Sequence, residues 1–140
     1  PNVIDIAGFT RITASSMQEV IRLSRLELGD WILKKEVNQD GDPFLHMYLE
    51  IPPEAQASEV TVRTVLTEHL SLYFKHFDSD YGDLKKLLNM EPLEITILRY
   101  GTIADYEARI GGRVSRINPG MLDIVGILHQ PNLYGREAKS

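Results

Sequence analysis

The first part of the chain switches between strand-like and helix-like spacing of its apolar residues. Residues 2–6 form a short β-branched run that ends at Ala7-Gly8, which predicts a strand. Ser16 is followed three residues later by Glu19, a spacing typical of a capping box, in which side chains satisfy the free amides at a helix start. The apolar residues that follow recur at helical spacing, so a helix ending near Gly29 is predicted.

The next stretch predicts a hairpin followed by a long helix. Residues 31–37 alternate as a half-buried strand does, and their Trp is expected in the core. Residues 38–43, Asn-Gln-Asp-Gly-Asp-Pro, are typical of a turn, and residues 44–51 form a second alternating strand. Ser58 is expected to cap a helix that runs to Phe77 and carries a broad apolar face.

The last third begins with another strand, over residues 92–100, which breaks at Gly101. A short segment, 102–109, leads into a loop over 111–118 that is rich in Gly and Arg. Beyond it, residues 121–128 are apolar and fit either an additional edge strand or a closing helix.

This order of elements predicts an α+β fold of the ferredoxin-like βαββαβ type. Its antiparallel sheet would carry two helices on one face, followed by a C-terminal extension. The chain is expected to form a single domain over residues 1–130, with a flexible tail over 131–140.

Composition narrows the possible functions. The 140 residues are 43% hydrophobic and 25% charged, which is typical of one soluble globular domain. The absence of cysteine excludes disulfides, thiolate catalysis and cysteine-based metal sites. A net charge of −5 with scattered basic residues argues against a nucleic-acid partner. No apolar run approaches the roughly 20 residues of a membrane helix, so no membrane partner and a cytoplasmic location are expected.

The histidines and aspartates give no metal site. His69 and His76 are seven residues apart and would lie about two helical turns from one another, too far to bind one ion. His46 is expected to be hydrogen-bonded or solvated within its strand. The acidic residues near 80 lack the glycine that an EF-hand loop needs at its sixth position, where Asp83 stands. We therefore expect no metal ligands.

The glycine-rich loop admits two interpretations. A strand that ends on Gly101 and leads into a loop with Gly and Arg is a common way to hold an anion near backbone amides. Gly111-Gly112 lacks the third glycine of a dinucleotide motif, and Ser115 lacks the Gly-x-Ser-x-Gly context of a nucleophile elbow. On spacing alone, a plain turn between two elements is favoured.

The motifs along the chain, taken together, carry more information than the spacing. They are Val3–Phe9, Asp78-Ser79-Asp80-Tyr81, Pro92-Leu93-Glu94-Ile95, Gly101-Thr102, Gly112 and Ile117-Asn118. In these motifs and their order, up to about residue 121, the chain resembles the C-terminal domain of the auxin-responsive acyl-acid amido synthetase family and its bacterial relatives. The family's pattern has a lysine where this chain has Met121, which cannot act as a cation.

The resemblance implies the mobile C-terminal lid of an adenylate-forming ligase. In that family ATP, with Mg, activates an acid to an acyl-adenylate, and an amine such as an amino acid then attacks it. The implied partners are the N-terminal ATP-binding domain of the same parent chain and the small-molecule acid and amine. ATP and Mg would belong to the parent enzyme, so the isolated domain is expected to be inactive and to hold no catalytic residue. The start at Pro1, without Met, fits a domain excised from a longer chain.

The resemblance also implies which residues face the nucleotide. Arg113 and Arg116 are candidates for contacting phosphate, because a guanidinium can bind it bidentately. With Met121 at the lysine position, either one of these arginines substitutes or the lid works without that cation. The nucleotide-facing candidates are Gly101, Thr102, Gly112, Arg113, Arg116 and Asn118, and the hinge-adjacent residues are Gly8 and Phe9.

Two other functions stay open. The chain could be a free-standing ferredoxin-like module that binds a small molecule or regulates without catalysis, because fold alone does not separate such modules from a lid. It could also be the lid of a ligase that has lost activity, which the missing lysine would fit. The presence or absence of an upstream domain in the gene discriminates the first of these from a lid.

Overall fold

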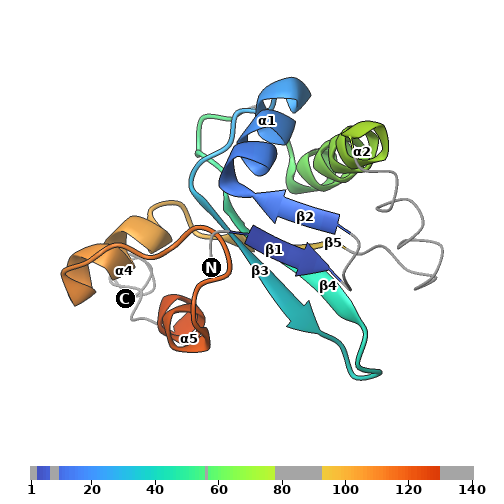
Figure 1. Ribbon diagram of the computed structural model, residues 1–140. Helices are drawn as coiled ribbons and strands as arrows, with labels where there is room; N and C mark the ends of the chain where they lie inside the picture. Colours follow the sequence, from blue (N-terminus) through green and yellow to red (C-terminus); the bar gives the residue numbers. More distant parts are fainter. Residues whose placement is uncertain (1–2, 7–9, 56, 78–92, 130–140) are drawn as a thin grey trace.

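The computed structural model describes residues 3–6, 10–55, 57–77 and 93–129, and Figure 1 shows how their helices and strands are arranged. The elements are, in order, β1 (Val3–Ile6), β2 (Thr10–Thr13), α1 (Ala14–Ser24), β3 (Trp31–Val37), β4 (Pro43–Glu50), α2 (Glu59–Phe77), β5 (Leu93–Leu98), α4 (Thr102–Ile110) and α5 (Met121–His129).

The described strands form two sheets. β3, β4 and β5 lie side by side in that order, while β1 and β2 form a separate antiparallel hairpin. The predicted α+β class is confirmed, with β2 as a strand that the sequence analysis missed. One detail of the prediction is wrong: β4 pairs antiparallel with β3 but parallel with β5. The long helix α2 explains this, since a crossover helix returns the chain to the same end of the sheet and permits a parallel neighbour.

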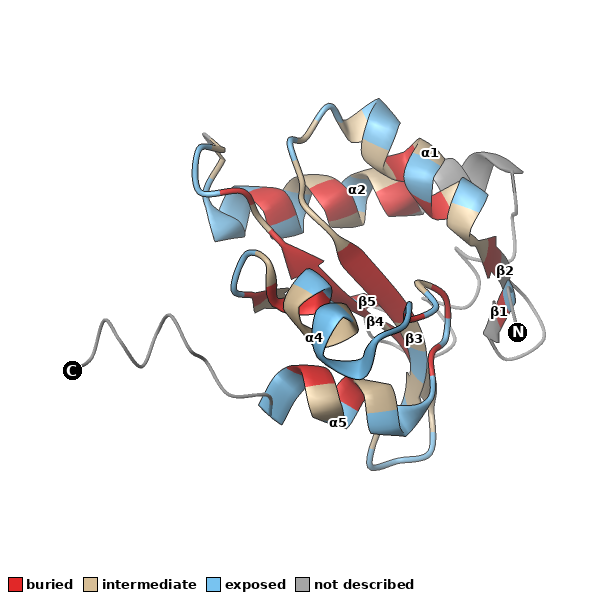
Figure 2. Ribbon diagram, turned by 90° about the vertical axis from the view of Figure 1, so that its left-hand side faces the viewer, coloured by how far each residue is buried: buried red, intermediate tan, exposed pale blue. Residues whose placement is uncertain are grey.

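Helices cover both faces of the three-stranded sheet (Figure 2). α1 and α2 lie on one face, as predicted, and α4 and α5 lie on the other. Alternate side chains of β3 pack on opposite faces of the sheet. Leu33 packs on the α1 and α2 side, and Ile32 packs on the α4 and α5 side. Trp31 is buried in the larger core, as expected. The C-terminal extension is therefore a second helical layer.

The boundaries of α1 differ from the prediction. Its N-cap is Thr13, whose hydroxyl accepts a hydrogen bond from the Ser16 amide at 3.1 Å, so Ser16 is the second member of the capping box. The helix ends at Ser24 instead of near Gly29, and Arg25 directly after it takes a left-handed conformation. Gly29 has another purpose, because a Cβ there would lie 3.1 Å from the Glu50 carbonyl oxygen. It permits the backbone to approach β4.

Three other expectations are confirmed. In the hairpin turn, the side chain of Asn38 accepts hydrogen bonds from the amides of Asp40 and Asp42, both at 2.9 Å. Ser58 caps α2, its hydroxyl accepting from the Thr61 amide at 3.2 Å. Residues 121–128, left open as strand or helix, belong to α5.

Some expectations lie outside the described residues: the segment 78–90, the acidic residues near 80, and the tail 131–140. Of the helices that the structure does describe, none combines the length and the apolar character needed to span a membrane.

Candidate functional site

The loop over residues 111–118 joins α4 to α5 and runs along the outer edge of β3. The Leu33 amide donates to the Arg116 carbonyl at 2.9 Å, and the Asn118 amide donates to the Leu33 carbonyl at 2.7 Å. Asn118 adopts φ of 50°, and its side-chain oxygen accepts from the Lys35 amide at 3.3 Å. Lys34 secures the next turn, with Nζ 2.9 Å from the Pro119 carbonyl oxygen. Asn118 thus fastens the loop to the sheet.

The amides at the start of α4 already hold an anion, which is the protein's own Glu50. Its Oε1 accepts from the Gly101 amide and its Oε2 from the Ile103 amide, both at 2.8 Å. Glu50 is only 2% exposed, and burial raises the pKa of its carboxyl group even though both amides favour the charged form. Gly101 adopts φ of 88°, a conformation that favours glycine.

Thr102 lies in the same turn and is buried, and its hydroxyl donates to the Arg99 carbonyl at 2.5 Å. Gly101 and Thr102 therefore shape the start of α4 around a carboxylate that belongs to the chain.

Arg116 uses every donor that its guanidinium has. Nε and Nη2 bind the two carboxylate oxygens of Asp30, at 2.8 and 2.7 Å. Nη1 and Nη2 bind Glu107, at 2.8 and 3.3 Å, and Nη1 also donates to the Val114 carbonyl at 2.6 Å. Since a guanidinium carries five N–H groups, none is left for a ligand.

The charges in this network stabilise one another. The hydrogen bond from Arg116 holds the pKa of Glu107 below its usual value, and Glu107 and Asp30 together raise the pKa of Arg116. Arg116 therefore ties the loop to the start of β3 and to α4. As the chain stands, it is placed to support the loop rather than to contact phosphate.

Arg113 differs from Arg116 in its surroundings. It is exposed, and it forms no ion pair with the described part of the chain. The turn before it is open: Gly111 adopts φ of 68°, and a Cβ at Gly112 would meet no atom within 4 Å. Of the two arginines that the sequence nominates, Arg113 has its guanidinium available at the surface.

The hinge-adjacent candidates Gly8 and Phe9 lie outside the described residues, but β1 just before them is described. An open cavity of about 380 Å³ brings this strand together with the loop. It is lined by Val3, Thr13, Ala14, Ser15, Ser115, Arg116 and Ile117. The start of the chain and the candidate loop are therefore neighbours, although some 110 residues separate them in the sequence. Met121, at the family's lysine position, is 55% exposed at the start of α5.

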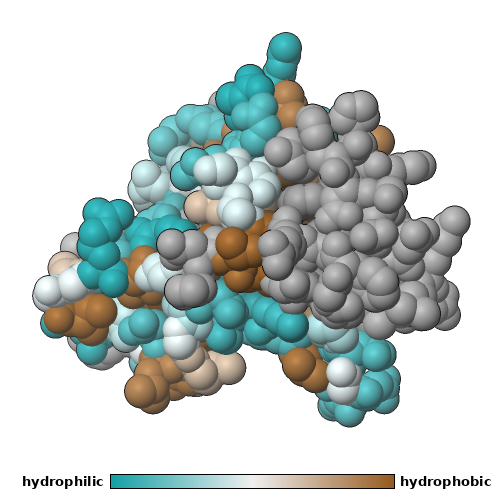
Figure 3. Space-filling view, in the orientation of Figure 1, coloured by the Kyte–Doolittle hydropathy of each residue, from teal (hydrophilic) through white to brown (hydrophobic). Residues whose placement is uncertain are grey.

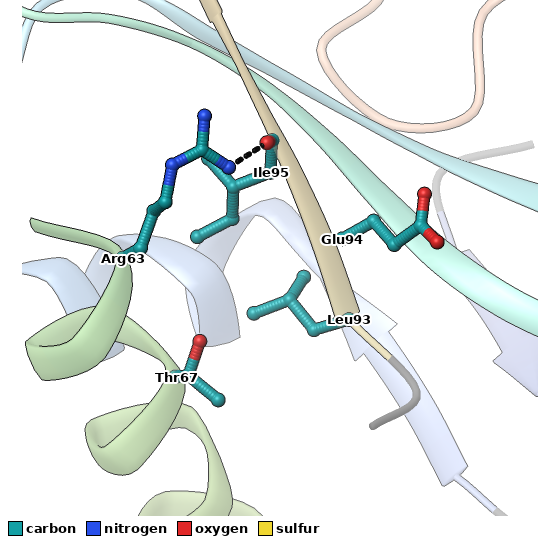
Figure 4. A pocket seen from close by; sticks show the side chains of 5 residues that line it. All are labelled: Arg63, Thr67, Leu93, Glu94 and Ile95. Atoms are coloured by element: carbon teal, nitrogen blue, oxygen red, sulfur yellow. Dashed lines mark hydrogen bonds between the residues drawn. The ribbon is translucent and has the colours of Figure 1, made fainter. Parts of the chain in front are cut away.

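A second cavity, of about 330 Å³, lies between α2 and the beginning of β5 (Figure 4). Arg63 and Thr67 face it from the helix, and the Arg63 guanidinium donates to the Ile95 carbonyl. Leu93 and Ile95 point toward the helix, whereas Glu94 points to the other side of the strand. None of the nucleotide-facing or hinge-adjacent candidates lines this cavity, although Leu93, Glu94 and Ile95 belong to one of the motifs that carry the resemblance.

The sequence analysis missed a polar network across the sheet. His46 Nδ1 lies 2.8 Å from Glu36 Oε1 and His46 Nε2 lies 2.5 Å from Thr96 Oγ1. Tyr48 donates to the other oxygen of Glu36 and stacks on the His46 ring at 4.1 Å between centroids. Burial is the main cause that raises the pKa of Tyr48. The signal that could have found the network is the position of all four residues on the same face of adjacent strands.

The order hydroxyl, imidazole, carboxylate is that of a catalytic triad. Catalysis would also require hydrogen-bond donors for an oxyanion near the hydroxyl. Neither cavity described above includes Thr96, and its neighbours Ile95 and Ile97 belong to a continuous strand. We therefore assign the network a structural role, which agrees with the expectation that His46 is hydrogen-bonded within its strand. Among the described residues, no group of three or more His, Asp or Glu side chains could hold a metal ion.

Comparison with known proteins gives little further guidance. No protein-family model matches the chain, and no curated protein matches it. Among solved structures, it is similar to a domain of phenylacetate-coenzyme A ligase from Bacteroides vulgatus, with 13% sequence identity and a TM-score of 0.48. The match covers 84% of this chain and 91% of that one. A likeness at this level assigns neither a family nor a function.

Proposed function

We propose that the chain is the C-terminal lid domain of an ATP-dependent, adenylate-forming acyl-acid amido synthetase. The parent enzyme would activate an acid to an acyl-adenylate with ATP and Mg and conjugate it to an amine. This domain would close over the nucleotide held by an N-terminal domain and exclude water from the reactive anhydride. The sequence motifs given above support the proposal.

The observation that carries the proposal is the contrast between the two arginines of the loop. A lid that contacts phosphate needs a cation that is exposed and held on a firm support. Arg113 is exposed, and the loop behind it is fixed by the five hydrogen bonds of Arg116. We assign the phosphate contact to Arg113 and the support to Arg116 and Asn118.

The other candidates contribute through the backbone. Gly101 and Thr102 set the start of α4, and Gly112 keeps the turn before Arg113 open. Met121 offers no charge, so in this proposal Arg113 supplies the cation of the lid.

The alternative is a free-standing module that binds a small molecule without chemistry. The cavity between β1 and the loop favours it, since polar residues, among them Thr13, Ser15 and Ser115, line a space of about 380 Å³. A cavity of this size is within the range of small-molecule sites.

The decisive experiment is to read the gene upstream of Pro1 and to assay the full-length product for ATP–pyrophosphate exchange. An upstream ATP-binding domain together with exchange supports the lid. Arg113→Gln should then reduce exchange by about 10-fold or more, whereas Arg25→Gln, at an exposed site after α1, should leave it unchanged. A gene without an upstream domain rejects the lid and directs attention to ligand screening.

A further inference from the structure

Helix α5 carries apolar side chains on its outer surface as well as on its inner one. Ile124 and Ile127 are buried against α4 and the sheet. Leu122 is 87% exposed, and the other members of the outer row are about half exposed. We call this row the α5 stripe, and it consists of Met121, Leu122, Val125 and Leu128. Figure 3 shows hydrophobic side chains on the surface over α5 and the end of α4.

The stripe is a continuous surface rather than a set of scattered residues. Met121, Val125 and Leu128 are spaced four and three positions apart, so they lie along one side of the helix, with Leu122 beside them. Ile110, at the end of α4, adds a further half-exposed apolar side chain. Contiguous exposed apolar surface of this kind marks an interaction site.

The size of the stripe bears on what could cover it. A stable interface between separate molecules needs about 20–30 residues on each side. The stripe supplies four side chains on a helix about 14 Å long, which is too little for a stable dimer. A small contact is sufficient when the two partners are covalently linked, because the linkage keeps their effective concentration high.

The stripe is close in sequence to the loop that presents Arg113. It begins at Met121, three residues after Asn118, the last residue of the loop that presents Arg113. A lid must also release its partner in each cycle, which a small apolar contact permits.

We propose that the α5 stripe is the surface through which this domain docks on an apolar patch of the N-terminal domain of its parent chain. This rests on the proposed function. Docking through the stripe would set the closed position of the lid and thereby place Arg113 over the nucleotide.

The test is amide hydrogen exchange of residues 121–129, compared between the 140-residue chain and the full-length protein. We expect exchange at least about fivefold slower in the full-length protein, because docking excludes water from the helix. The double variant Leu122→Asp/Val125→Asp should abolish this difference. Leu72→Asp, at a site on α2 that is 64% exposed, is the matched control and should preserve it. If the double variant does not fold, Leu122→Asp alone serves, since aspartate is favourable in the first turn of a helix.

The outcomes separate this inference from the proposed function. An upstream domain with adenylation activity, but equal exchange in the long and short proteins, overturns the inference alone. Slow amide exchange that persists in the full-length double variant also overturns the inference alone. A gene without an upstream domain overturns both. A concentration-dependent dimer of the short chain that the double variant abolishes assigns the stripe to a second copy and rejects the tethered partner.

Discussion

Replacing Arg116 with methionine should make the domain easier to unfold. The exposed surface of the domain should stay unaltered. Arg116 lies between two carboxylates, Asp30 on one side and Glu107 on the other, with its side chain 21% exposed. Methionine keeps much of the apolar stem but removes all five hydrogen bonds. The two carboxylates would then face one another without a cation, and the Val114 carbonyl would lose its donor.

The expected loss lies between two limits. Removing one partner of a fully buried pair costs about 3–5 kcal/mol, whereas an exposed pair contributes about 0–1 kcal/mol. The side chains of Asp30 and Glu107 are 33% and 16% exposed, so solvent screens them in part. We therefore expect a loss of about 2 kcal/mol, which for a domain of this size lowers Tm by roughly 6–10 °C.

The pH dependence gives the prediction a second readout. In the wild type, Arg116 holds the pKa of Glu107 below its ordinary value of 4.5. This contribution to stability is present above that pH and is lost as the pH falls. The difference in Tm between wild type and variant should therefore be largest near neutral pH and should narrow in acid.

Thermal unfolding followed by circular dichroism measures both effects, and Arg113→Met is the matched control. Arg113 is exposed and forms no ion pair within the described residues, and its charge contributes less than Arg116 to the lowered pKa of Glu107, so its substitution should change Tm by no more than about 2 °C. Equal Tm values for the two arginine variants would refute the argument that Arg116, and not Arg113, stabilises the fold. A difference that widens in acid would refute the role given to Glu107.

Three further predictions follow from packing, burial and the missing partner domain. Gly126→Ala should cost about 1–2 kcal/mol in urea unfolding, because its Cβ would lie 2.5 Å from the Tyr106 ring, while Gly120→Ala, which meets nothing within 4 Å, should be neutral. Glu50→Gln should be less stable than wild type at low pH, since the amide can accept from only one of the two backbone donors. Because burial raises the pKa of Glu50, the wild type loses stability as the pH rises above 4.5, and the difference in stability between wild type and variant should shrink. A difference that stays constant with pH would contradict the raised pKa. The 140-residue chain alone should show no ATP–pyrophosphate exchange, and measurable exchange would reject the assignment as a lid.

The sequence predicted those parts of the fold that local patterns determine. The hairpin of β3 and β4 followed from alternation around an Asn-Gln-Asp-Gly-Asp-Pro turn, and α2 from a serine cap and helical spacing. β2 was missed because a four-residue strand carries little periodicity, and it directly abuts α1. The parallel partner of β4 could not be read locally, since the direction of pairing depends on how the chain returns after α2.

The sequence nominated the loop as a candidate site, but it did not predict the contacts that the residues of the loop make. Pattern and resemblance led to the loop over 111–118, which the structure places on the edge of β3. The partners of its residues come from distant positions, Glu50 for Gly101 and Asp30 for Arg116, and no local signal connects them. The two arginines therefore look alike in sequence, although one is fully paired and the other is exposed.

The contacts of the second helical layer have a consequence for folding order. Asp30 and Arg116, which help fasten it, are 86 positions apart, whereas β3 and β4 pair across a short turn. Closing so long a loop is slow compared with forming a hairpin. The α4 and α5 layer should be the last part to assemble and the first to open, so its position can change while the sheet and α2 remain intact.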